Sequence, residues 1–267
     1  MLKDITLGQY FPGDSIIHRL DPRTKLILVI MYIVALFMAK GFVGYAVMML
    51  IFAGAVRLSK VPPKSMFKGL KPVVIIIALT AVLNLFYTPG EPLVSFWVFT
   101  ITKEGIVKAI FMVLRIIMLI SGTFLLTYTT APVALTDGME LLLGPLKKIK
   151  VPVHEMSMMM SLALRFIPTL IEETDKIMSA QKARGADFET GSIIQRAKAL
   201  LPILVPLFIS AFRRADELAV AMESRCYNGG EGRTRMKILR YEKCDYVALT
   251  LGALMIGVMI LLQVVGL

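Results

Sequence analysis

Five long apolar runs constrain the fold of this chain more than any other feature. They are Thr24–Ala39, Phe42–Val56, Pro72–Tyr87, Gly105–Thr130 and Tyr246–Leu267. A helix needs about 20 apolar residues to cross a bilayer, so the first two runs predict a short hairpin that is either upright or shallow. The chain is 57% hydrophobic with a mean hydropathy of +0.73, whereas soluble domains are about 45–50% apolar. These runs predict a membrane protein with several spans.

The basic residues are distributed unevenly between the loops that join these runs. Each odd-numbered run is preceded by a strongly basic segment, and the opposite loops hold little beyond Lys40 and Lys103. Since Lys and Arg collect on the cytoplasmic side, we expect a multi-pass protein of the cell membrane with its N-terminus in the cytoplasm and its C-terminus outside. The same cytoplasmic bias explains the net charge of +11, and the expected partner of the apolar runs is the lipid bilayer. No nucleic-acid-binding motif accompanies it, so no nucleic-acid partner is expected.

The segment between the fourth and fifth runs predicts three further helices on the cytoplasmic side. Their expected ranges are 132–146, 152–184 and 193–225, and each of the last two has roughly 30 residues. The early halves of these two helices are apolar nearly all round, which is typical of a buried or membrane-contacting helix. The alternative is that Val153–Leu170 and Ile193–Ala211 are two more spans. We therefore divide the chain into a membrane domain (1–130), a cytoplasmic domain (131–245) and a last span (246–267).

Two matched tripeptides end the two long helices. Ala183-Arg184-Gly185 and Ser224-Arg225-Cys226 are offset by 41 residues, and an aspartate precedes each arginine by nine positions, as Asp175 and Asp216. An arginine and a glycine at a helix C-terminus satisfy exposed carbonyls, so capping explains a single such tripeptide. A repeated pattern favours docking to a partner, because the arginine fork suits carboxylates and carbonyls in a groove.

No pattern of residues predicts catalysis, a cofactor or a metal site. The chain has no P-loop, HExxH or GxSxG motif, and its two histidines and two cysteines have no spacing typical of metal ligands. We therefore expect the protein not to be an enzyme. Lys108 and Arg115 lie seven residues apart in the fourth run, which suggests a self-sufficient carrier or channel as an alternative. No acidic residue lies within any run, which argues against ion coupling.

Several motifs together resemble the EcfT family. They are Gly13-Asp14-Ser15, the stretch from His18 to Lys25, Leu141–Leu146, Leu164–Pro168 and the two arginine tripeptides. EcfT proteins are the transmembrane coupling components of energy-coupling factor vitamin transporters, and the CbiQ-type subunits of cobalt transporters are more distant relatives. The resemblance implies an all-α membrane protein, with about five transmembrane helices and three cytoplasmic or interfacial coupling helices, of which the last two are long and cross.

The resemblance also implies partners and their contact residues. In this family, each arginine motif docks into one of two ATP-binding-cassette ATPases, and a separate S component binds the vitamin. The implied docking residues are Ala183, Arg184, Gly185, Ser224, Arg225 and Cys226. Ser224 and Cys226 depart from the family pattern, so we expect the two ends to differ in the ATPase they prefer.

A methionine-rich surface at the start of the second long helix is a candidate contact for S components. Its residues are Met156, Met158, Met159, Met160 and Leu164, and flexible thioether side chains suit a surface that meets several partners. The resemblance thus implies an energy-coupling subunit of an ATP-driven vitamin importer, with ATP hydrolysis in other chains. A subunit of a cobalt or nickel importer remains a second alternative.

Overall fold

In the computed structural model the chain divides into two compact units. The membrane unit comprises residues 8–141 and 239–267, and the long-helix unit is taken mainly from residues 142–238. The structure describes residues 10–89, 92–96, 99–188, 190, 192–230 and 238–265. Each unit is described separately below.

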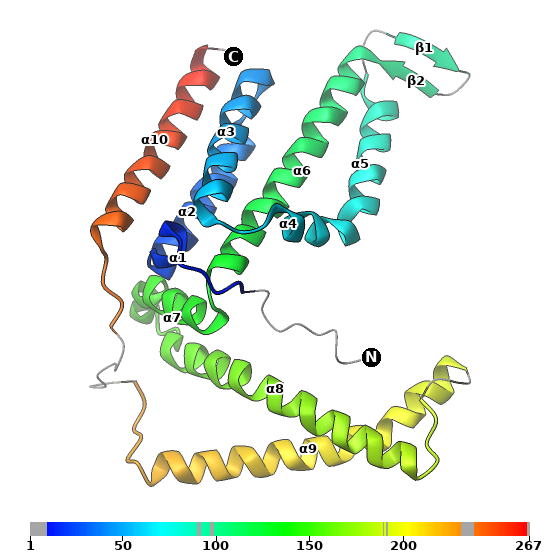
Figure 1. Ribbon diagram of the computed structural model, residues 1–267, viewed down its shortest axis with the longest axis vertical. Helices are drawn as coiled ribbons and strands as arrows, with labels where there is room; N and C mark the ends of the chain where they lie inside the picture. The colour runs from blue at the N-terminus through cyan, green and yellow to red at the C-terminus, as the bar shows by residue number, and fades with distance from the viewer. Residues whose placement is uncertain are drawn as a thin grey trace. The chain divides into compact units, whose positions relative to one another are not determined.

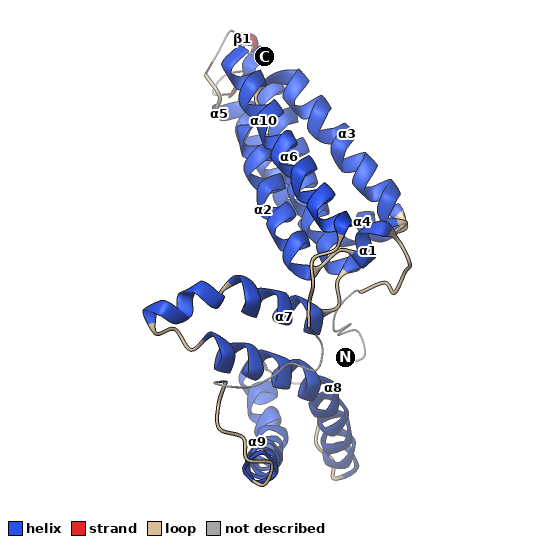
Figure 2. Ribbon diagram, turned by 90° about the vertical axis from the view of Figure 1, so that its left-hand side faces the viewer, coloured by secondary structure: helices blue, strands red, loops and turns tan. Residues whose placement is uncertain are grey.

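Helices make up most of the membrane unit (Figures 1 and 2). They are α1 (Ile16–Arg19), α2 (Pro22–Met38), α3 (Gly41–Ser59), α4 (Pro63–Leu70), α5 (Val74–Tyr87), α6 (Lys103–Thr129), α7 (Pro132–Leu142) and α10 (Lys243–Val265), with a short 3-10 turn η2 (Lys71–Val73) between α4 and α5. In this unit α2 packs against α10 and α6, and α6 also contacts α3, α4 and α5. The helix α6 is therefore the central element of the unit.

Among the residues that the structure describes, four helical runs are long and apolar enough to cross a membrane. They are Gly41–Ser59, Pro63–Tyr87, Lys103–Thr129 and Lys243–Val265. Four of the five predicted spans thus correspond to such helices. The remaining one, α2, has 17 residues, which is at the short end of the roughly 17–25 that a crossing helix uses.

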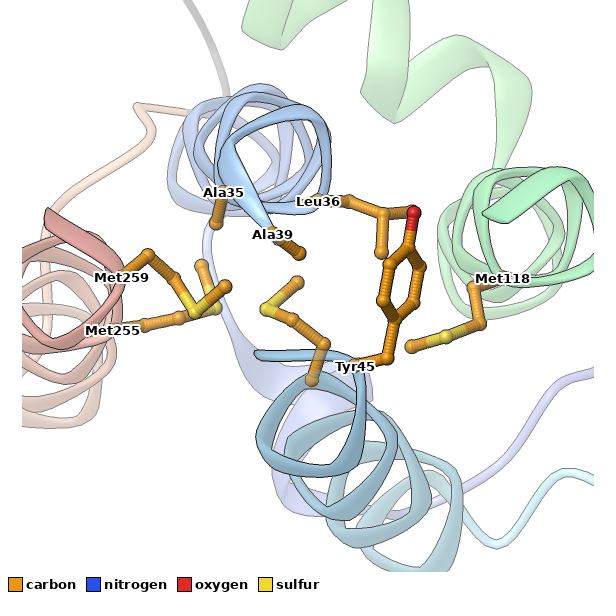
Figure 3. Packing of buried hydrophobic residues seen from close by; sticks show 8 residues of the cluster. Ala35, Leu36, Ala39, Tyr45, Met118, Met255 and Met259 are labelled. Atoms are coloured by element: carbon orange, nitrogen blue, oxygen red, sulfur yellow. The ribbon is translucent and has the colours of Figure 1, made fainter. Parts of the chain in front are cut away.

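The core of the membrane unit lies where α2, α3, α6 and α10 meet. Figure 3 shows Ala35 and Leu36 of α2, with Ala39 just after its end, facing Tyr45 of α3, Met118 of α6 and two methionines of α10. The small alanines let the helices approach closely, and unbranched methionines fill the irregular space between them. Close approach is also visible at Gly122, where an added Cβ would lie 2.5 Å from the Tyr32 ring.

A short hairpin and a shorter α7 depart from the sequence predictions. Strands β1 (Pro92–Phe96) and β2 (Phe99–Thr102) pair antiparallel between α5 and α6, in a segment for which the sequence predicted no strand. Helix α7 was expected over 132–146 but ends at Leu142, and a 3-10 helix η3 (Gly144–Ile149) follows. Pro145 enforces this end, because it cannot continue the α-helical hydrogen bonds. By its contacts most of α7 belongs to the membrane unit, whereas the sequence grouped it with the cytoplasmic helices.

The N-terminal motif forms a buried polar clamp within the membrane unit. Asp21 caps α2 by accepting from the backbone N–H of Arg23 at 2.9 Å, and its own N–H donates to Asp245 Oδ1 of α10 at 2.9 Å. Arg23 donates to Asp21 and to the carbonyl of Leu239. Lys25 Nζ donates to the carbonyls of His18 and Thr129 at 3.2 and 2.9 Å. The clamp therefore joins the start of α2 to the end of α6 and the start of α10.

The charge state of the clamp follows from these contacts. Burial alone would raise the pKa of Asp21, but the hydrogen bonds and the charge of Arg23 outweigh it and lower the pKa. Asp245 is 1% exposed and accepts two backbone N–H groups, from Asp21 and Glu242. The stretch from His18 to Lys25, which entered the sequence analysis only as part of the family resemblance, thus holds three helices of the membrane unit together.

Two long helices, α8 (Val153–Ala183) and α9 (Ile193–Glu223), make up most of the long-helix unit, and each has 31 residues. Both stay α-helical through their internal prolines, Pro168 in α8 and Pro202 and Pro206 in α9. The start of α9 is a capping box, in which Ser192 and Gln195 satisfy each other's backbone N–H groups. Figure 1 shows the two helices crossing, as the family resemblance implied.

Candidate functional site

The first arginine tripeptide ends α8 with a complete Schellman motif. The N–H of Gly185 donates to the carbonyl of Lys182, and the N–H of Ala186 donates to the carbonyl of Gln181, both at 3.0 Å. Gly185 has φ +87°, the left-handed conformation that this motif requires. Arg184 is the last residue before the reversal, so its side chain projects from the helix tip.

The second tripeptide ends α9 with the same hydrogen bonds, each 41 residues later. The N–H of Cys226 donates to the carbonyl of Glu223 at 2.9 Å, and the N–H of Tyr227 donates to the carbonyl of Met222 at 3.1 Å. Cys226 takes the left-handed position with φ +56°. Arg225 therefore occupies the same place in its helix end as Arg184 does in the first.

The departures at Ser224 and Cys226 leave the backbone geometry unchanged. A non-glycine residue has a steric cost in the left-handed region, roughly 1–2 kcal/mol, so α9 adopts this end against the preference of its own sequence. At Gly185 an added Cβ would meet nothing within 4 Å. The two ends thus differ in the side chain at the reversal and agree in the path of the chain.

All six residues of the two tripeptides are exposed. Neither the Arg184 nor the Arg225 guanidinium has an ion-pair or hydrogen-bond partner in the described part of the chain. Each end therefore presents a five-donor cation on an exposed tip.

A polar cluster joins α8 and α9 where they cross. Glu173 of α8 accepts a hydrogen bond from Ser210 Oγ of α9 and pairs with Arg214 through Oε2 at 3.3 Å. The Arg214 guanidinium also lies over the Phe166 ring, 5.7 Å from its centre. These side chains are partly buried, with 26% exposure for Glu173 and 29% for Arg214. Phe166 belongs to the Leu164–Pro168 motif, which thereby gains a packing role.

The crossing point is the same position in both helices. Glu173 and Arg214 are separated by 41 residues, which is also the offset between the two arginine ends. Each tip lies 11 residues beyond its own crossing residue, or about 16 Å at 1.5 Å per residue. The two ends are therefore related by an approximate two-fold axis through the Glu173–Arg214 pair.

A second contact pattern agrees with this symmetry. Near the first tip, Gln181 Nε2 donates to the carbonyl of Pro202 at 3.4 Å, in the early half of α9. Near the second tip, Tyr227 Oη donates to Met158 Sδ at 3.1 Å, in the early half of α8. A residue close to each arginine end therefore contacts the early half of the other helix.

The methionine-rich surface is largely open. Met156, Met159 and Met160 are 48%, 58% and 43% exposed, whereas Met158 and Leu164 are partly buried. The early half of α9 adds exposed apolar side chains. They include Leu200, Leu201, Leu204, Val205, Phe208 and Ile209. A surface of this kind is typical of an interaction site.

The two cations of α6 do not form a joint site. Arg115 Nε donates to Tyr45 Oη at 2.8 Å, and its terminal nitrogen donates to the carbonyl of Ala39 at 3.4 Å, just beyond the end of α2. Lys108 is exposed. Arg115 therefore caps α2 and fixes the α2–α3 turn, which removes the main observation in favour of a self-sufficient carrier. Within the described ranges, no three potential metal-ligating side chains gather.

Sequence comparisons give the family. A family model described as CbiQ, cobalt transport protein, matches residues 13–237. A Clostridium kluyveri protein named energy-coupling factor transporter transmembrane protein EcfT is 54% identical over 266 residues, which cover 99% of this chain and 98% of the relative. Proteins of the same name from Thermosediminibacter oceani and Bacillus subtilis are 56% and 51% identical, covering 96% and 90% of this chain and 97% and 91% of those relatives. The chain belongs to the CbiQ family, and within it to the EcfT transmembrane proteins of energy-coupling factor transporters.

Proposed function

We propose that this chain couples ATP hydrolysis in two ATP-binding-cassette ATPases to substrate import by a separate S component. Its relatives are named as transmembrane proteins of energy-coupling factor transporters. The nucleotide sites and the substrate site would belong to other chains. The substrate class is a vitamin in this proposal, by the resemblance to EcfT.

The observation that carries the proposal is the pair of matched helix ends. Arg184 and Arg225 project from identical backbone reversals, on helices that cross at equivalent residues. Two similar ends related by an approximate two-fold axis fit a partner that offers two similar grooves. A pair of homologous ATPases, each receiving one arginine, has this property.

The crossing would let the pair of ends move together. Long helices joined by a polar cluster and by packed side chains transmit displacement as a rigid body. A movement of the two ATPases would then displace the crossed pair as a whole, and with it the early halves of α8 and α9. Those early halves carry the exposed Met156, Met159 and Met160, which we assign to S-component contact.

We place the N-terminus in the cytoplasm and the C-terminus outside, with α2, α3, α5, α6 and α10 as the five spans. The support is that α2 and α10 both begin at the polar clamp, so they cross in the same direction, as an odd number of spans requires. A C-terminal reporter active only in the cytoplasm should therefore stay silent, and an active one would contradict this orientation.

The proposal is tested with Arg184→Glu and Arg225→Glu combined in one chain. The double variant should insert in the membrane but fail to co-purify with the ATPases in mild detergent, because each arginine is replaced by a group of the same charge as the acceptors it would meet. Arg165→Glu with Arg213→Glu is the matched control, since both arginines are exposed on the shafts of the same helices. Normal ATPase recovery with the tip variant would refute the proposal.

A further inference from the structure

The turn from α3 to α4 gathers cations without any acid nearby in the sequence. Its five basic residues are Arg57, Lys60, Lys64, Lys68 and Lys71. No aspartate or glutamate occurs between residues 22 and 90, and none of the five side chains has an ion-pair partner in the described part of the chain. All five are exposed. Their positive charges are therefore available to a binding partner outside this chain.

Helix α4 is held firmly against the bundle by its other face. Met66 and Leu70 are 5% and 8% exposed, and the Tyr128 hydroxyl of α6 donates to the carbonyl of Ser65 at 3.1 Å. An added Cβ at Gly69 would lie 2.5 Å from the Phe124 ring, so a glycine is needed for this approach. Figure 1 shows α4 lying across the bundle rather than along α6. The helix is thus fixed where the spans α3 and α5 meet the aqueous side.

The outer face of α4 and the first residue after it form a lysine stripe. Lys64, Lys68 and Lys71 follow the spacing i, i+4 and i+7, which places them on one side of a helix. Met66 and Leu70 lie on the opposite side. Phe67 is 72% exposed and falls between the two faces, at the edge of the stripe. An amphipathic helix with a cationic face and an exposed aromatic ring beside it is typical of the membrane interface.

We propose that the α3–α4 turn binds the headgroups of anionic phospholipids in the leaflet that surrounds α3 and α5. The lysine stripe supplies ammonium groups at headgroup level, and Phe67 inserts among the acyl chains beside them. Lysine side chains extend far enough to reach phosphates while their stems stay on apolar surface. The occupant must be anionic, because five unpaired cations in one turn repel each other and would gain nothing from a zwitterionic surface.

Two alternative roles for these lysines can be distinguished from lipid binding by experiment. If the lysines serve only to orient the chain during insertion, the purified protein should not distinguish anionic from zwitterionic lipid. If they meet an acidic protein surface, the headgroup should again be irrelevant, and substitution should matter only when the partner subunit is present.

The experiment uses the full-length chain in detergent micelles with equal amounts of phosphatidylglycerol and phosphatidylcholine. Lipid retention is read by native mass spectrometry, together with the thermal midpoint at increasing phosphatidylglycerol. We expect preferential retention of phosphatidylglycerol, and a loss of retention in Lys64→Gln/Lys68→Gln/Lys71→Gln of roughly fivefold for each lysine removed. Replacing the same lysines by arginine should preserve the preference.

The matched control is Lys176→Gln/Lys182→Gln/Lys198→Gln, which removes the same charge from α8 and α9. It should retain phosphatidylglycerol like the unaltered chain. Equal retention of the two lipids by the unaltered chain would overturn the proposal, as would equal loss in both triple variants, or an effect that appears only with partner subunits added. If the α4 variant does not fold, added salt should still release phosphatidylglycerol selectively from the unaltered chain, and a salt-insensitive lipid ratio would contradict the proposal.

Discussion

At the end of α8 the left-handed position belongs to Gly185, and at the end of α9 it belongs to Cys226. Both ends form the same two hydrogen bonds at the chain reversal. Only the end of α8 has a glycine there, which adopts the left-handed conformation without a steric cost. The glycine end therefore follows local preference, whereas the cysteine end forms in spite of it. The comparison separates the path of the chain, which the two ends share, from the local preference for that path, which they do not share.

The largest effect should come from replacing each of the two arginines singly. Arg184→Glu and Arg225→Glu, made singly, should each weaken ATPase binding by about 2–5 kcal/mol if each docks in a buried charged groove. The measurement is co-purification with each ATPase in turn. If the ends prefer different ATPases, each variant should lose a different partner first. Identical losses from both variants would show that the side chains at Ser224 and Cys226 do not affect selectivity.

The second effect concerns the crossing that relates the two ends. Glu173→Arg or Arg214→Glu alone should place like charges across the crossing and lower the free energy of unfolding by about 1 kcal/mol, since the pair is partly exposed. The double variant should recover part of this loss, both in thermal midpoint and in ATP-driven transport. Glu172→Arg with Arg213→Glu reverses exposed neighbours and is the control. No recovery in the double variant would mean that the ion pair does not join the helices.

The third effect isolates the reversal itself. Gly185→Ala should destabilise the end of α8 by roughly 1 kcal/mol, entirely through the backbone, because the added methyl group meets no neighbour. Cys226→Gly should stabilise the end of α9 by only a few tenths of a kcal/mol, since relief of strain is partly offset by a more flexible unfolded chain. Amide hydrogen exchange at the two ends measures both changes. An unchanged exchange rate at both ends would show that conformational preference does not distinguish them.

A comparably small effect is expected at the opposite ends of the same helices. Helix α9 begins with a capping box, whereas Pro152 at the start of α8 offers no side-chain cap. Ser192→Ala should cost about 0.5–1 kcal/mol, measured by thermal unfolding, and Ser192→Asp should restore the cap. A neutral Ser192→Ala would indicate that packing alone fixes where α9 begins.

The features that could be predicted from the sequence are those that depend on residues close together in the chain. The bounds of α8 and α9 fell within about two residues of the predicted ends, as is usual for strongly patterned helices. The reversal at Gly185 was likewise readable from local chemistry. The hairpin of β1 and β2 was missed, since its segment is short and its strands are stabilised by each other.

Contacts between distant residues could not be predicted. The pairing of Glu173 with Arg214 needs the crossing of two helices, although the shared offset of 41 residues was visible in the arginine ends. The left-handed Cys226 contradicts its own propensity, so no local rule could identify it. The role of Asp21 was hidden for the same reason, because its partner Asp245 lies 224 residues away.

That separation has a consequence for how the protein is made. Both long helices are translated between Asp21 and Asp245, so the N-terminal motif emerges from the ribosome long before its acceptor exists. A contact of such high sequence separation is slow to form and comes late. The membrane unit is therefore completed only after α8 and α9 have been synthesised, and a chain truncated before α10 would leave the buried N–H of Asp21 without its carboxylate. Closure of the clamp thus marks the stage of synthesis at which the start of α10 has been made.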